Sequence, residues 1–142
     1  YTIVYDNDAN VSLGDGAVYR PRNYDLNYWG AMTAREALAT SRNIPAVKLT
    51  EQMGEDRVLR FLREAGFYQQ NPAQKQQPAS AFGPGIALGI SGATLLDLTR
   101  AYGSFAVQGE LLPVWIGRDT DERPLVYGSA PAGGQNPRLC PR

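Results

Sequence analysis

The spacing of apolar residues predicts helices in the central and later parts of the chain. Between residues 55 and 65, apolar positions recur every three or four residues, as they do on the buried face of a helix. These positions are Val58, Leu59, Leu62 and Ala65, and Gly66 follows in the place of a C-terminal cap. The same spacing predicts a helix from 94 to 107, which begins with the capping pattern Thr94-Leu-Leu-Asp97. Its apolar positions are Leu95, Leu98, Ala101, Tyr102 and Phe105.

A shorter helix is predicted before a polar break in the first half of the chain. It runs from Ala34 to Thr40 and turns Ala37 and Leu38 toward the core. It begins at Thr33-Ala-Arg-Glu36, a capping box in which the threonine hydroxyl accepts from the glutamate amide and the carboxylate bonds back. The break that follows is Ser41-Arg42-Asn43.

Another helix is predicted directly after this break, from Ile44 to Gln52. Asn43 would cap its first turn, where the missing amide of Pro45 costs nothing, and Gly54 would end it. Its predicted buried positions are Ile44, Val47 and either Leu49 or Met53. A hydroxyl and an amide two residues apart, in a break between helices, can both point into a cleft. Ser41 and Asn43 are therefore candidate binding residues.

Strand-forming residues lie near both ends of the sequence. Residues 1–5 are Tyr, Thr, Ile, Val and Tyr, which favour a short strand, and two more are predicted at 111–116 and 125–127 around a turn. An aromatic-rich loop at 19–30 is predicted to pack against the helices. The pattern as a whole indicates an α+β fold in which helices dominate.

Composition narrows the classes of function. The chain has 142 residues, about one domain's worth, and its 43% hydrophobic content is sufficient for a core. The net charge is zero, which gives no basic excess for binding nucleic acid or an anionic membrane, and no apolar run is long enough for a transmembrane segment. There is no histidine, and the single cysteine, Cys140, can form neither an internal disulfide nor a cysteine-based zinc site. No metal or cofactor is predicted.

The sequence alone contains no complete catalytic set. Without histidine, Ser41 could be activated only by another base, such as the lysine of a Ser-x-x-Lys motif. The two lysines are Lys48 and Lys75, and the residues three positions before them are Pro45 and Pro72. No Lys-Thr-Gly sequence occurs either.

Two blocks of sequence resemble the transpeptidase domain of class A penicillin-binding proteins. The first is Gly30-x-x-Thr33-x-Arg-Glu-Ala-Leu-Ala-x-Ser41-x-Asn43-Ile-Pro-Ala-Val47. The second is Ala87-Leu-Gly89 followed by Thr94-x-x-Asp97-Leu-Thr-x-Ala-Tyr-x-x-Phe105-Ala-x-x-Gly109. In that family Ser-x-Asn is the second of three active-site motifs, between Ser-x-x-Lys and Lys-Thr-Gly. Because only the middle motif is present, we expect this chain to be a piece of a longer protein.

The resemblance implies roles for two residues. Ser41 would hydrogen-bond the lysine of the first motif and relay a proton to the departing D-alanine nitrogen. Asn43 would bind the backbone amide of the peptidoglycan stem peptide, or of a β-lactam, and Arg42 is the variable position with no role. The parent would be a D,D-transpeptidase that works through an acyl-serine intermediate, anchored to the membrane and facing the extracytoplasmic side of the inner membrane in a bacterial cell envelope. The isolated chain, which lacks the nucleophile, would be inactive.

The resemblance also sets expectations for the fold and leaves alternatives open. Residues 1–127 would be part of a transpeptidase domain of the penicillin-binding and serine β-lactamase type, with most of the central sheet missing, and 128–142 a disordered tail. Helices that pack on that sheet should then carry an uncovered apolar face. Helix capping alone could explain Ser41 and Asn43. The chain could also be a non-catalytic transpeptidase-like remnant that binds a peptide or a protein.

Overall fold

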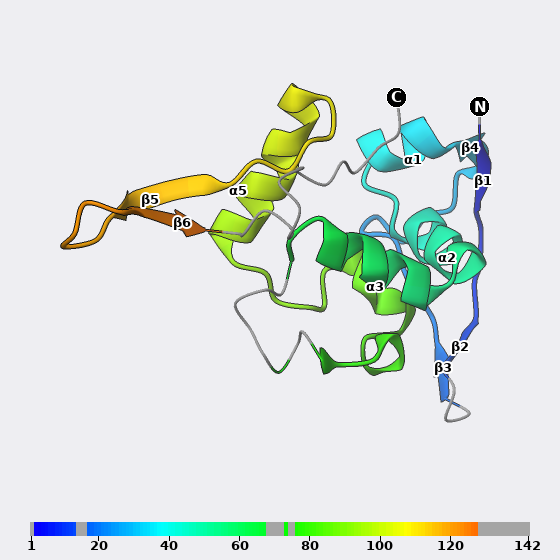
Figure 1. Ribbon diagram of the computed structural model, residues 1–142. Coiled ribbons are helices and arrows are strands. Elements are labelled where there is room, and N and C mark those ends of the chain that lie inside the picture. Colours follow the sequence, from blue (N-terminus) through cyan, green and yellow to red (C-terminus); the bar gives the residue numbers. More distant parts are fainter. Residues whose placement is uncertain (1, 14–16, 68–72, 74–75, 128–142) are drawn as a thin grey trace. The chain divides into compact units, whose positions relative to one another are not determined.

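The computed structural model describes residues 2–13, 17–67, 73 and 76–127, and they form two compact units. Unit 1 comprises Tyr1–Leu59 and Pro78–Ser91, and unit 2 comprises Arg60–Gln77 and Gly92–Arg142. The described ranges contain helices and three separate two-stranded antiparallel sheets (Figure 1). This arrangement confirms the predicted α+β, mainly helical fold. The tail predicted to be disordered, 128–142, lies outside the described residues.

The first sheet of unit 1 joins the start of the chain to a segment about 30 residues later. β1 (Ile3–Asp6) pairs with β4 (Gly30–Thr33), so that Val4 lies opposite Met32. Both side chains are buried with Ala37, and together they form a small apolar core. A second sheet pairs β2 (Val11–Leu13) with β3 (Ala17–Tyr19). The strand predicted at the start of the sequence is confirmed.

The helix before the polar break is α1 (Ala34–Ala39). Its predicted capping box is present: the Thr33 hydroxyl accepts from the Glu36 amide (3.1 Å), and the Glu36 carboxylate accepts from the Thr33 amide (2.9 Å). Ala37 is buried as predicted. The prediction for Leu38 is wrong, because this side chain is 83% exposed and faces an open cavity.

The helix after the break is α2 (Asn43–Met53), and Ile44 and Val47 are fully buried on it, as predicted. Gly54 ends it with a φ of 85°, a conformation that glycine adopts without penalty. Two short 3₁₀ helices, η1 (Ala79–Ala81) and η2 (Gly83–Leu88), complete unit 1, and η2 packs against α2.

Unit 2 is built on a helix and a hairpin. α3 (Glu55–Glu64) begins in unit 1 and continues into unit 2, where Gly66 caps it as predicted. α5 (Leu95–Gly103) is followed by a 3₁₀ helix, η3 (Ser104–Val107), so the predicted helix changes type at its C-terminal end. The two predicted late strands are present as β5 (Val114–Arg118) and β6 (Pro124–Tyr127), but the first begins three residues later than predicted, because 111–113 are not in a strand.

On α5, two charged side chains are buried while the large apolar side chains are exposed. Its buried residues are Asp97, Arg100 and Ala101. The large apolar side chains of α5 and η3 are exposed: Leu95, Leu98, Tyr102 and Phe105. This helix thus carries an exposed apolar face, and the expectation that a sheet from the rest of the parent domain covers such a face stays a prediction. No helix in the described part of the chain is long and apolar enough to cross a membrane.

Candidate functional site

A cavity of about 400 Å³ opens in unit 1 beside the turn that joins α1 to α2. Most of its lining is apolar: Val4, Ala34, Ala37, Leu38, Pro45, Ala46, Leu49, Ala87 and Leu88. The polar members of the lining are the three residues of the break, Ser41, Arg42 and Asn43. The structure thus brings both predicted site residues to the wall of one cavity. An apolar pocket with a few convergent polar groups is the usual form of a small-ligand site.

Ser41 occupies the turn in a left-handed conformation, with a φ of 53°. Its amide donates to the Leu38 carbonyl (3.1 Å), and the next amide, that of Arg42, donates to the Ala37 carbonyl (2.9 Å). Non-glycine residues seldom adopt this backbone conformation, and those that do are concentrated at functional sites. Within the described ranges, the Ser41 hydroxyl has no hydrogen-bond partner. It is exposed, so it can exchange hydrogen bonds with a group that enters the cavity.

Asn43 is held in place by a carbonyl of a distant loop. Its Nδ2 donates to the Arg22 carbonyl (2.9 Å), while its side-chain oxygen has no partner among the described residues. A half-buried amide fixed at its nitrogen presents the oxygen as an acceptor in one orientation. The arrangement suits recognition of an N–H group.

Asn43 does not cap α2, and the prediction that it would do so is wrong. The N-cap position belongs to Arg42, whose side chain makes no capping bond. The cap comes instead from Asn23, whose Oδ1 accepts from the amides of Asn43 (3.0 Å) and Ile44 (3.3 Å). Because a residue 20 positions earlier satisfies these amides, the side chain of Asn43 is released for another role.

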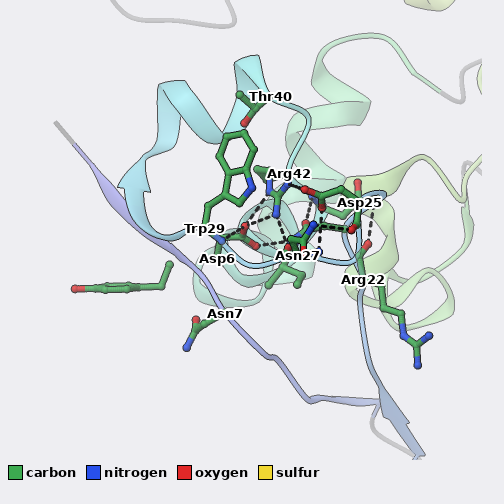
Figure 2. A network of polar contacts seen from close by, with 12 residues as sticks. Asp6, Asn7, Arg22, Asp25, Asn27, Trp29, Thr40 and Arg42 are labelled. Atoms are coloured by element: carbon green, nitrogen blue, oxygen red, sulfur yellow. Dashed lines mark hydrogen bonds and ion pairs between the residues drawn. The ribbon is translucent and has the colours of Figure 1, made fainter.

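The third residue of the break, Arg42, is the centre of a buried polar network (Figure 2). Its Nε donates to Asp6 (2.8 Å), and its Nη1 donates to Asp25 (2.9 Å). Its Nη2 lies 2.7 Å from Asp6 and also donates to the Asn27 carbonyl. All three guanidinium nitrogens are therefore bonded, two of them to the same carboxylate. Charge-assisted pairs of this kind are the strongest hydrogen bonds available to side chains.

Asp6, at the end of β1, is the fully buried acceptor of this network. Besides Arg42, it accepts from the side-chain amide of Asn23 (2.6 Å) and the backbone amide of Trp29 (3.0 Å). A buried carboxylate needs such partners, because removing it from water without them costs several kcal/mol. Asp6 thus connects β1, the 22–29 loop and the start of α2.

The aromatic-rich loop contributes one ring to the network. The Arg42 guanidinium lies over the ring of Trp29, 4.5 Å from its centroid, within the range of a cation–π interaction. Trp29 thus contacts the residue that precedes α2, although the Trp29 side chain is 56% exposed. For Tyr24 the prediction is wrong, because that side chain is fully exposed.

The network also shifts the acidity of its members. The hydrogen bond from Arg42 lowers the pKa of Asp25 below its ordinary value, against the smaller opposing effect of burial. For Arg42 burial opposes the charge most strongly, but the hydrogen bonds to Asp25 and Asp6 together outweigh it, so its pKa rises. Both groups are therefore ionised at neutral pH. Among the described residues, no cluster of acidic, histidine or cysteine side chains could hold a metal ion.

Sequence reasoning missed Arg42, Asp6 and Asn23. Arg42 was given no role because it is the variable middle position of the Ser-x-Asn motif in the family that the sequence resembles. Asp6 lies 36 positions away, and their contact depends on the pairing of β1 with β4. The one available signal was an aspartate that directly follows an apolar strand, a position where a buried carboxylate calls for a cation.

A protein-family model described as the penicillin-binding protein transpeptidase domain matches residues 4–136. The chain belongs to this family. The resemblance found in its two sequence blocks is therefore confirmed.

Individual relatives agree with this assignment. Penicillin-binding protein 1C of Escherichia coli strain K12 is 35% identical over 114 residues, which is 79% of this chain and 14% of that protein. Penicillin-binding protein 1A of Neisseria meningitidis serogroup A is 33% identical over 107 residues, covering 72% of this chain and 12% of that protein. The chain thus spans only a small part of the length of these relatives.

A solved structure shows the same fold. The crystal structure of penicillin-binding protein 1A from Haemophilus influenzae matches 87% of this chain and 18% of that one, with a TM-score of 0.68 and 28% sequence identity. The mixture of helices and small sheets in this chain corresponds to part of that structure.

Proposed function

We propose that this chain is part of a peptidoglycan D,D-transpeptidase, which cross-links stem peptides through an acyl-serine intermediate and binds β-lactams. One observation carries the proposal. In a chain that belongs to the penicillin-binding transpeptidase family, Ser41 and Asn43 line one cavity, and the hydroxyl of Ser41 has no partner within the described residues. A proton relay requires a free hydroxyl, which Ser41 has, and binding of a peptide N–H requires an open acceptor, which the Asn43 side-chain oxygen provides.

Ser41 has the role of proton relay in this proposal. The nucleophilic serine and its lysine come from the parent protein, outside this sequence. The lysine takes the proton of the nucleophilic serine as that serine bonds to the acyl carbon. When the bond between this carbon and the D-alanine nitrogen breaks, the Ser41 hydroxyl gives its proton to the nitrogen and receives the proton held by the lysine. Such a transfer needs donor and acceptor about 2.6–3.2 Å apart and contributes roughly 10²–10⁴-fold to the rate.

Asn43 has the role of holding the substrate. Its side-chain oxygen accepts from a backbone N–H of the stem peptide, or from the side-chain amide N–H of a β-lactam. The bond to the Arg22 carbonyl fixes the direction of this oxygen before the substrate arrives. Residues 1–127 would thereby supply half of one wall of the active-site cleft, in a parent anchored to the extracytoplasmic face of the inner membrane.

The test is covalent labelling with a fluorescent penicillin, applied to the complete natural protein that contains this sequence. The complete protein should be labelled, and Ser41→Ala should lower the acylation rate constant by about 10²–10⁴-fold. Ser80→Ala, which removes another exposed hydroxyl of unit 1, should leave the rate unchanged. The 142-residue chain alone should stay unlabelled. If the complete protein binds stem peptides but is never labelled, the chain is instead part of a non-catalytic binding module.

A further inference from the structure

Arg42 lies between the two residues assigned to the chemistry and is held more firmly than either. Its guanidinium is bonded at every nitrogen, to Asp6, Asp25 and the Asn27 carbonyl, and one face of it lies on Trp29. A planar group with this many fixed contacts has one orientation, and the Cα to which it is attached is fixed accordingly. We call this set of contacts the Arg42 clamp.

The backbone on both sides of Arg42 needs such support. On one side, Ser41 is in a left-handed conformation that its side chain disfavours. On the other side, α2 begins without a capping side chain of its own, since Arg42 makes no capping bond and Asn23 supplies it from another loop. Two local backbone bonds close the turn, from the Ser41 amide to Leu38 and from the Arg42 amide to Ala37. The unfavourable φ of Ser41 is nevertheless balanced, and the cap of α2 is supplied, by contacts from outside the local sequence.

The clamp and the helix cap share one carboxylate. Asp6 accepts from Arg42 with Oδ2 and from the Asn23 amide with Oδ1, and Asn23 in turn caps the amide of Asn43. The position of Asn43 therefore depends on Asp6 by two routes, one through Arg42 and one through Asn23. Ser41 is attached to the same set of bonds through the peptide that joins it to Arg42.

We propose that Arg42 is a positioning residue that sets the placement of the Ser41 hydroxyl and the Asn43 amide through its clamp on Asp6 and Asp25. The inference rests on the proposed transpeptidase function. Arg42 lines the cavity, but its guanidinium nitrogens are all bonded to Asp6, Asp25 and the Asn27 carbonyl, so it takes no part in proton transfer. It acts by holding two neighbours in a strained turn, and a misplacement of about 1 Å in such groups can cost on the order of 10²-fold in rate.

The experiment measures the second-order rate constant of acylation by a fluorescent penicillin, in the complete natural protein. Arg42→Lys keeps the charge but cannot bond Asp6, Asp25 and the Asn27 carbonyl together, and it should lower the rate constant by on the order of 10²-fold. Asp25→Asn removes the charge of one partner that is 36% exposed, so this variant should lose only a little melting temperature and about tenfold in rate. Arg60→Lys, on an exposed part of α3, and Asp8→Asn are the matched controls and should behave as wild type.

A double-variant cycle separates positioning from general stability. If Arg42 acts in part through Ser41, then Arg42→Lys should lower the rate by a clearly smaller factor once Ser41→Ala is present. Only the effect that runs through Asn43 then remains, because groups that act as a unit are non-additive. A purely structural role would give the same factor in both backgrounds.

Each outcome of these measurements either supports or overturns the positioning role of Arg42. Reduced rate constants for Arg42→Lys and Asp25→Asn at full labelling stoichiometry, with non-additivity against Ser41→Ala, support the inference. Wild-type rate constants in both variants, or full additivity, overturn it while leaving the proposed function in place. A complete protein that is never labelled overturns the proposed function and this inference with it. If Arg42→Lys fails to fold, the rate constant of Asp25→Asn alone tests the inference. The partly exposed Asp25 carboxylate can be neutralised while the buried pair of Arg42 and Asp6 stays in place.

Discussion

Two arginines, one in each unit, are buried to the same degree but in different surroundings. Arg42 in unit 1 and Arg100 in unit 2 each expose 6% of their surface. Arg42 faces two carboxylates. Arg100 donates from Nε to the Leu112 carbonyl (2.8 Å), and its Nη1 has no partner in the described part of the chain. Equal burial therefore does not mean equal stabilisation.

The pKa values of the two arginines differ in the same way as their surroundings. Burial lowers the pKa of Arg100, and the attraction of Asp97 and Tyr127 offsets this only in part. For Arg42 the balance is reversed, and the pKa rises. Asp97, one turn before Arg100, accepts instead from the hydroxyl of Tyr127 (2.7 Å). A buried cation is well stabilised only where a carboxylate is directed at it. Unit 1 supplies Asp6 and Asp25 to Arg42 in this way.

The largest expected effect comes from removing the carboxylate that completes the Arg42 environment. Asp6→Ala leaves Arg42, Asn23 and the Trp29 amide without their acceptor, so we expect unfolding free energy to fall by about 3–5 kcal/mol. Denaturant unfolding measures the loss, with Asp8→Ala, an exposed aspartate two residues later, as the control. A loss no larger than that of the control would show that unit 1 does not depend on this carboxylate.

A smaller effect is expected from the side chain that caps α2. Asn23→Ala removes the acceptor for the amides of Asn43 and Ile44, and the loss of a cap costs about 0.5–2 kcal/mol. Faster hydrogen exchange at the first turn of α2 should accompany it. The exposed Asn27→Ala keeps its backbone carbonyl, so it should change stability by less than about 0.5 kcal/mol. Equal effects of the two variants would contradict the assigned cap.

The comparison of the two arginines can be tested directly by replacing each with methionine. Arg100→Met loses one bond to a carbonyl and a buried charge that Asp97 and Tyr127 offset only in part, so we expect a change within about 1 kcal/mol in the 142-residue chain. Arg42→Met should be as damaging as the loss of Asp6, because it leaves that carboxylate buried without a cation. The ratio of the two effects, measured by denaturant unfolding, is the quantity of interest. Equal losses would mean that the two environments do not differ in energy.

The smallest expected effect is a dependence on acid. Because the pKa of Asp25 is lowered in the folded state, its contribution is present above the ordinary aspartate pKa of about 3.9 and is lost as the pH falls through the lower folded-state value. Melting temperatures between pH 5 and pH 2 should therefore fall more steeply in the wild type than in Asp25→Asn. Parallel curves would argue that Asp25 is not held by Arg42 in solution.

Local patterns in the sequence predicted the helices well, because the interactions that begin and end them span only a few residues. The capping box at Thr33, the Thr94 hydroxyl bond to the Asp97 amide and the glycine caps all follow from neighbours along the chain. Ser41 and Asn43 were predicted as site residues from their place in a helix break and from the family resemblance, and their chemical roles stay predictions.

The parts that could not be predicted depend on long-range contacts. Asn23 caps a helix 20 residues away, and Asp6 finds Arg42 across 36 residues only after β1 and β4 have paired. The same holds for the exposure of Leu38, which depends on the shape of the cavity that α1 and α2 leave between them. Spacing along a chain carries no information on such contacts.

At the left-handed turn, the residue that would be most stable differs from the residue that the proposed chemistry requires. Glycine adopts a φ of 53° without strain, so Ser41→Gly should make this turn more stable, yet it would remove the hydroxyl. Selection for thermal robustness alone would therefore drive this position away from serine, as stabilising changes at active sites commonly reduce function. In a laboratory evolution experiment, the retention of serine here against a heat challenge would measure how strongly the cell requires the hydroxyl.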